Sequence, residues 1–114
     1  MKRVLIQDIT INNYFIKTGK ELIGIMALPQ EWMNIAKQHR HAGRLEAAEV
    51  ACRQGLEENR DNTQLLHLLS VILYETRKLP ESLQAIDKAI SINGGITSYH
   101  NNRAVLLYEM GQIG

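Results

Sequence analysis

Apolar positions follow helical spacing along most of this chain, and they are densest between residues 64 and 74. That stretch, QLLHLLSVILY, contains no formally charged residue, and its seven leucine, isoleucine and valine side chains leave almost no polar face. A helix that is apolar all round is covered on several sides. The pattern therefore predicts a central helix that ends near Arg77, with one packing neighbour before it and another after it.

Prolines and glycines mark the ends of the other expected helices. Proline suits the first turn of a helix because its fixed φ is helical and its missing N–H would lack a partner there. Glycine commonly ends a helix by taking a left-handed conformation. The predicted helices besides the central one begin at Pro29, Leu45, Pro80 and Tyr99, and the last runs to Met110 and is closed by Gly111. Short turns between five helices indicate an all-α chain.

Residues 1–28 have a different pattern. Residues 4–11 carry β-branched side chains, Asn12-Asn13 suits a turn, and residues 14–16 could return as a strand. Residues 21–28 could equally form a short helix. The segment is either a flap that caps the first helix or a poorly ordered leader.

Composition narrows the class of protein. The chain has 114 residues, which is the length of one domain. Its 13 basic and 12 acidic side chains nearly balance, so net charge is not expected to attract it to nucleic acid or to a membrane. Its one cysteine, Cys52, cannot form an internal disulfide, which favours a reducing compartment. No apolar run is long enough to span a membrane. These features predict a cytoplasmic protein.

A 34-residue period runs through the chain from residue 29 onward. Small residues coincide at one position of the first helix of each unit, apolar residues coincide after the turn, and glycines coincide in the turn. The coinciding sets are Ala36, Ser70 and Ala104; Leu45, Leu79 and Ile113; and Gly43 with Gly111. Small residues at fixed positions let neighbouring helices approach closely.

This pattern resembles the tetratricopeptide repeat. The family's first helix carries a large, an apolar, a small and an aromatic residue, and the corresponding sites here are Trp32, Ile35, Ala36 and His39; Leu66, Leu69, Ser70 and Leu73; and His100, Arg103, Ala104 and Leu107. The resemblance implies a right-handed superhelix of about two and a half helix pairs, over residues 29–62, 63–96 and 97–114. Arg103 departs from the pattern and needs an acidic partner or an exposed position.

The resemblance also implies a function, because such arrays bind peptides or proteins along the concave face made by the first helix of each pair. The implied groove residues are Gln30, Met33, Lys37, Arg40, Gln64, His67, Val71, Tyr74, Ser98, Asn101, Asn102, Val105 and Tyr108. The lysine, asparagine and arginine set with which some members grip a C-terminal carboxylate is missing. We therefore expect a non-catalytic module that binds an extended segment of a protein partner.

Two other functions compete with this one. Residues 41–49 and 99–102 look like repeats that precede bacterial glycosyltransferase and sulfotransferase domains related to O-GlcNAc transferase, where asparagines form a ladder along the groove. Asn34 and Asn102 occupy the ladder position, but Leu68 interrupts it. The chain would then be the accessory region of a truncated transferase. Alternatively, the apolar last helix pairs with its copy in a homo-oligomer.

Catalysis, metal binding and a cofactor are not expected from the residues. The cluster of Lys37, His39, Arg40, His41 and Arg44 lies at the end of a helix, where basic side chains complement the dipole and stay solvated. Cys52 falls at an inward position without a base beside it. The pattern brings together neither an acid–base pair nor a nucleophile with its base.

Overall fold

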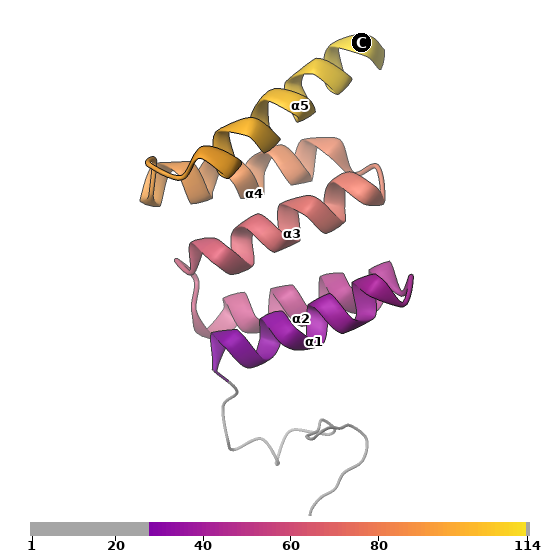
Figure 1. Ribbon diagram of the computed structural model, residues 1–114, viewed down its shortest axis with the longest axis vertical. Coiled ribbons are helices and arrows are strands. Elements are labelled where there is room, and N and C mark those ends of the chain that lie inside the picture. The colour runs from indigo at the N-terminus through magenta and orange to yellow at the C-terminus, as the bar shows by residue number, and fades with distance from the viewer. Residues whose placement is uncertain (1–27, 114) are drawn as a thin grey trace, which may run out of the picture.

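The computed structural model describes residues 28–113, which form five helices stacked one after another (Figure 1). The helices are α1 Pro29–His41, α2 Leu45–Glu58, α3 Thr63–Glu75, α4 Leu79–Ile92 and α5 Thr97–Ile113. The expected strand, flap or leader of residues 1–27 lies outside the described residues.

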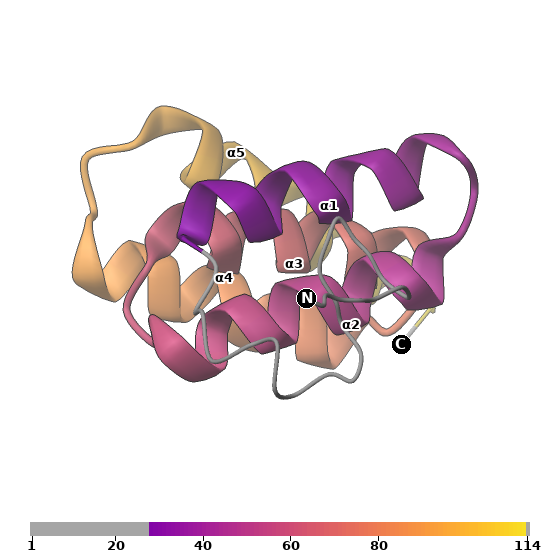
Figure 2. The same cartoon turned by 90° about the horizontal axis from the view of Figure 1, so that it is seen from below.

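The helices form pairs, and the pairs stack along the long axis of the molecule. α1 packs with α2 and α3 with α4, and α5 packs against α4 at the far end. Seen along the stack, α2 and α4 lie on one side while α1 and α5 lie on the other (Figure 2). The molecule measures 51 × 27 × 17 Å. The predicted all-α stack of repeated helix pairs is confirmed.

The core is built around α3, as its unbroken apolar pattern predicts. Leu65, Ile72 and Leu73 are at most 1% exposed, and α3 contacts every other helix. One buried cluster joins α3 to α1 and α2, and a second joins it to α4 and α5. Each such side chain contributes roughly 1.5–3 kcal/mol when it leaves water. The contacts of α3 therefore hold the two ends of the stack together.

Small residues set how closely the helices approach. Ala36 and Ala48 are fully buried between α1 and its neighbours. At Gly55 an added Cβ would lie 2.9 Å from both Trp32 Cβ and Leu65 Cδ1, so only hydrogen fits there. The period in the sequence thus marks the sites where backbones meet.

The turns use one repeat position with a left-handed backbone. Gly43 has φ 81°, and Arg77, at the equivalent position of the next unit, has φ 64°. Gly111 is the third member of this set, yet it lies within α5, which continues to Ile113. The prediction that Gly111 closes the last helix is therefore wrong. At the other two positions a second helix folds back after the turn, and no described helix follows Gly111.

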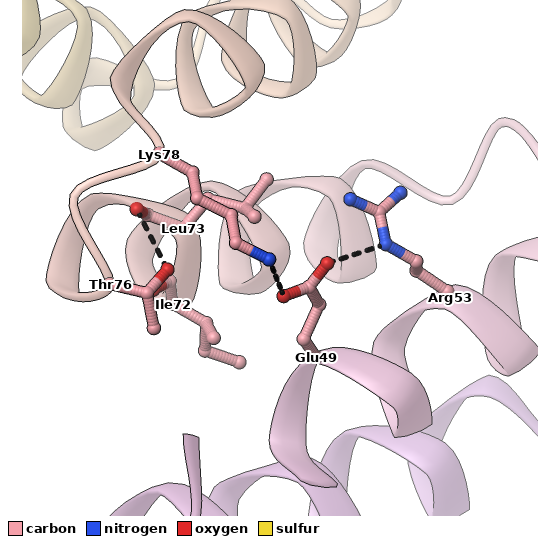
Figure 3. A network of polar contacts seen from close by, with 6 residues as sticks. All are labelled: Glu49, Arg53, Ile72, Leu73, Thr76 and Lys78. Atoms are coloured by element: carbon pink, nitrogen blue, oxygen red, sulfur yellow. Dashed lines mark hydrogen bonds and ion pairs between the residues drawn. The ribbon is translucent and has the colours of Figure 1, made fainter. Parts of the chain in front are cut away.

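A polar clasp joins α2 to the turn between α3 and α4 (Figure 3). The Glu49 carboxylate accepts a hydrogen bond from Arg53 Nε at 2.9 Å and another from Lys78 Nζ at 3.1 Å. Burial disfavours the charged carboxylate, but these two bonds outweigh it and lower the pKa of Glu49. The adjoining turn is closed by Thr76, whose hydroxyl lies 3.2 Å from the carbonyl oxygens of Ile72 and Leu73.

Alanine substitutions at Gly43 and Gly111 should shift stability in opposite directions. Gly43→Ala forces a side chain into a left-handed backbone with nothing else within 4 Å, which costs about 1–2 kcal/mol. Gly111→Ala, also with nothing within 4 Å, stabilises a helical position by about 0.5–1 kcal/mol. Urea unfolding followed by circular dichroism measures both. Equal effects of one sign would show that the two backbones do not differ as described.

The Glu49 clasp should make stability depend on pH. Because the folded-state pKa of Glu49 is lowered, its contribution is present above the ordinary carboxylate pKa and is lost as pH falls through the folded-state value. Glu49→Gln should cost up to about 1 kcal/mol at pH 7 and progressively less as pH falls below the ordinary carboxylate pKa. Glu46→Gln, on the same helix, is the matched control. A Glu49→Gln loss that persists undiminished at pH 3 would exclude the ionic explanation.

Candidate peptide-binding groove

The first helices of the three units form one continuous face. Among the described helices α1 contacts α3 and α3 contacts α5, whereas α2 and α4 do not contact each other. Elements that lie closer together on one side of a stack make that side concave. The face of α1, α3 and α5 is therefore the inner face of the curve, as the resemblance implied.

A hollow of about 260 Å³ lies on this inner face. Its lining comes from all three first helices and from one buried residue of α4. The lining residues are Arg40, Ser70, Val71, Tyr74, Glu75, Ser82, Asn102, Val105 and Leu106. Five of the residues predicted for the groove are therefore brought together around one space: Arg40, Val71, Tyr74, Asn102 and Val105.

The floor of the hollow is closed by a satisfied pair of serines. Ser82 Oγ donates to the carbonyl oxygen of Ser70 at 2.7 Å, and the two hydroxyl oxygens lie 3.0 Å apart. Both residues are at most 1% exposed. Because their hydrogen bonds are already made, the serines fix α3 against α4 and leave recognition to the walls.

The walls combine apolar and amide groups. Val105 is 47% exposed and Val71 is half-buried, so a ligand could cover apolar surface on α3 and α5 together. Asn102 is half-buried beside them and, within residues 28–113, its amide makes no hydrogen bond. An amide offers both a donor and an acceptor.

Two polar rungs tie the first helices together along one end of the face. Arg40 of α1 makes a bidentate pair with Glu75 of α3, with N–O distances of 2.9 and 2.6 Å. One unit later, Tyr74 OH donates to Glu109 Oε2 at 2.8 Å. Arg77 Nη1 donates to the other oxygen of that carboxylate at 2.9 Å. Arg40 therefore stays partly exposed, as expected, but it is also paired with Glu75, which its place in the basic cluster did not predict.

Neither acceptor, Glu75 or Glu109, was predicted from the sequence, although a signal was present. Each rung joins residues 35 apart, and the two rungs are related by the repeat period, so that Glu75 falls on Glu109. Hydrogen bonds from Arg77 and Tyr74 lower the pKa of Glu109. The bond between Tyr74 and Glu109 in turn raises the pKa of Tyr74. The carboxylate therefore stays charged and the phenol neutral near pH 7.

The remaining predicted groove residues lie outside the hollow. His67 lies against the buried ring of Tyr99 at a tilt of 46°, with 4.9 Å between ring centroids. Met33 is only 9% exposed and belongs to the core cluster, so its assignment to the groove surface is corrected. The exposed members of the set are Gln30, Lys37, Gln64, Ser98, Asn101 and Tyr108.

Two further side chains with reactive or charged groups, Arg103 and Cys52, have structural explanations. Arg103 Nε reaches Asp87 at 2.6 Å, which supplies the acid that this residue was expected to need. Burial raises the pKa of the fully buried Cys52 to about 12, so it stays a thiol. Residues 28–113 contain no group of three or more His, Cys, Asp or Glu side chains placed to hold a metal. None of these helices is long and apolar enough to cross a membrane.

A larger hollow of about 640 Å³ lies on the opposite side, over α3 and between α2 and α4. Its rim includes Arg53, Glu81 and Lys88, of which Arg53 is paired with Glu49. Leucines form its floor, but they are already buried: Leu66, Leu69 and Leu73 are 5%, 4% and 1% exposed. The smaller inner hollow is preferred as the candidate site because residues predicted for the groove line it.

Comparisons with known proteins agree with this fold. No protein-family model matches the sequence, and no curated protein matches it. Among solved structures, a mutant form of the O-GlcNAc transferase of Thermobaculum terrenum is similar, with a TM-score of 0.65 and 26% sequence identity over 69% of this chain. The chain spans 15% of the length of that protein. The similarity supports an all-helical repeat of the type that the sequence resembles.

Proposed function

We propose that this chain is a non-catalytic protein-interaction module whose inner groove binds an extended segment of another protein. The hollow between α3 and α5 carries the proposal, because it places an amide beside two valines on a face that runs across three helices. A cluster of this kind suits a peptide backbone with one apolar side chain inserted between the walls.

Each wall has a separate part in this binding. Val71 and Val105 would contact the inserted side chain from the two helices. The Asn102 amide would exchange hydrogen bonds with one peptide group of the partner, since an extended backbone presents an N–H and a C=O at every residue. Tyr74 offers its ring as a further contact while its hydroxyl stays bonded to Glu109.

The rungs prepare the groove for binding. Because Arg40–Glu75 and Tyr74–Glu109 already join α1 to α3 and α3 to α5, the spacing of the walls is set before a partner arrives. They also neutralise the charges beside the hollow. The choice of a peptide partner would therefore rest on the shape of the groove and on the Asn102 amide. Such a site suits binding and not catalysis.

A second candidate is an accessory region of a glycosyltransferase or sulfotransferase. The similarity to the O-GlcNAc transferase of Thermobaculum terrenum favours it, because a short helical array resembles part of a much longer enzyme. Reading the coding DNA beyond the codon for Gly114 tests this candidate. It requires a continuing frame with further repeats and then an α/β domain, and a frame that closes at that codon would reject it.

Asn102→Ala should weaken peptide binding without unfolding the domain. Twelve-residue peptides selected from a random phage library on the full chain provide the probes. Loss of one or two hydrogen bonds of about 1 kcal/mol each predicts a roughly five- to thirtyfold rise in Kd by fluorescence anisotropy. The urea midpoint should not change.

Gln54→Ala is the matched control, because it removes an exposed amide from α2, outside the inner face. It should leave the same peptides bound with unchanged affinity. Two results would contradict a site in the groove. One is that the peptides bind Asn102→Ala as tightly as the parent chain, and the other is that Gln54→Ala weakens their binding as much as Asn102→Ala does.

A further inference from the structure

One row of side chains crosses the inner face at the level of the hollow. Lys37 of α1, Val71 of α3 and Val105 of α5 occupy the same position of the 34-residue repeat. The two polar rungs show that this register holds in space, because residues 35 apart meet on successive first helices. Val71 and Val105 line the hollow, so Lys37 lies at the α1 end of the same row. A segment laid along the row would meet a cation first and then two apolar side chains.

Lys37 carries the charge that its neighbours on the inner face leave uncompensated. Arg40, about one turn further along α1, is paired with Glu75. The Glu109 carboxylate of α5 is paired with Arg77. Lys37, by contrast, is exposed and makes neither an ion pair nor a hydrogen bond with any other side chain of residues 28–113. The inner face is therefore left with positive charge at this one end of the row.

A carboxylate is the group that this end of the row favours. The lysine ammonium is a compact charge with three donors and no acceptor. An ion pair at an exposed site contributes little affinity by itself. Across an interface, however, a matched charge fixes the register of the partner and excludes partners of the wrong charge. Lys37 thus adds a charged determinant to the shape of the groove and to the Asn102 amide.

The spacing of the row sets the distance between the two groups in the partner. α1 contacts α3, and α3 contacts α5. Packed helices have axes about 8–10 Å apart, so the space between the two valines lies about 12–15 Å from Lys37. An extended chain advances about 3.3 Å per residue and turns alternate side chains to the same face. Four residues therefore cover the distance and bring both side chains to the groove.

We infer that Lys37 is a second subsite of the groove, for an aspartate or glutamate that lies four residues from the apolar side chain in the hollow. The Lys37 ammonium donates to the carboxylate, while Val71 and Val105 enclose the apolar side chain. The recognised group is a side-chain carboxylate within the segment, so the partner needs no free chain end. This inference rests on the proposed function, because it concerns the same groove and names the chemistry of its partner.

The first test is the sequence that the groove selects. Twelve-residue phage peptides selected on the full chain should share an aspartate or glutamate four positions before or after an apolar residue. The same selection on Lys37→Glu should keep the apolar residue and lose the acid. Parent-selected peptides that share the apolar residue without the acid would overturn the inference.

Charge reversal gives the quantitative test. One selected peptide is compared by fluorescence anisotropy in three forms, with its acid, with the corresponding amide and with lysine at that position. The amide form should bind the parent chain up to about fivefold more weakly than the acid form. This difference should shrink at about 1 M salt, where the Debye length is about 3 Å. Lys37→Glu should reverse the order and bind the lysine form best, and urea unfolding checks that its fold is intact.

Lys88→Glu is the matched control, because it makes the same charge change on α4, at the hollow on the opposite side of the molecule. Its side chain is 46% exposed. This variant should keep the parent preference for the acid form. A reversal of that preference by Lys88→Glu as well would assign the effect to overall charge and overturn the subsite.

The Asn102→Ala variant separates this inference from the proposed function. Peptides that Asn102→Ala weakens, but that bind Lys37→Glu as tightly as the parent chain, would keep the groove and overturn the Lys37 subsite alone. A selection that yields no binding peptide would reject both. A stable dimer of the chain alone that Lys37→Glu dissolves, measured by light scattering, would also overturn the inference, because the occupant would then be a second copy.

Discussion

Burial of α3 on all sides is the constraint from which the rest of this structure follows. Its leucines and isoleucines fill both clusters of the core, so removing one leaves a cavity that two helix pairs share. Leucine-to-alanine cavities typically cost 2–5 kcal/mol. Such a helix can be solvated on neither side, and it therefore requires a pair before it and further helices after it. The small residues at the closest approaches, Ala36 and Gly55 among them, then fix how far each neighbour lies from α3.

The same register that packs the core also builds the surface sites. Ser70 packs on Ser82 at the floor of the inner hollow because both occupy small-residue positions of the repeat. With that distance set, residues 35 apart meet on successive first helices, and the two polar rungs form. These exposed rungs add little stability individually. Their consequence is geometric, since they hold the helix spacing that defines the walls of the groove.

The sequence predicted the helices because they depend on spacing within one segment, and the resemblance to a repeat family implied the concave face. It also indicated that Arg103 needed an acid, and Asp87 provides one. It did not reveal the Arg40–Glu75 pair, because such a partnership depends on how two helices cross and not on either pattern alone. Met33 was misassigned for a related reason: the repeat position gives the direction of a side chain, and the packing of neighbouring leucines decides how deeply it is covered. Gly111 carries the signature of a turn, but its backbone stays helical where no second helix follows in the described chain.

α5 contributes one wall of the groove and is exposed on its other side. Asn102 and Val105 form a wall of the groove, while Leu107 and Tyr108 belong to the exposed side. α5 is held by α4 and by the bonds of Glu109 to Tyr74 and Arg77, so the wall that it contributes to the groove keeps a fixed distance from α3.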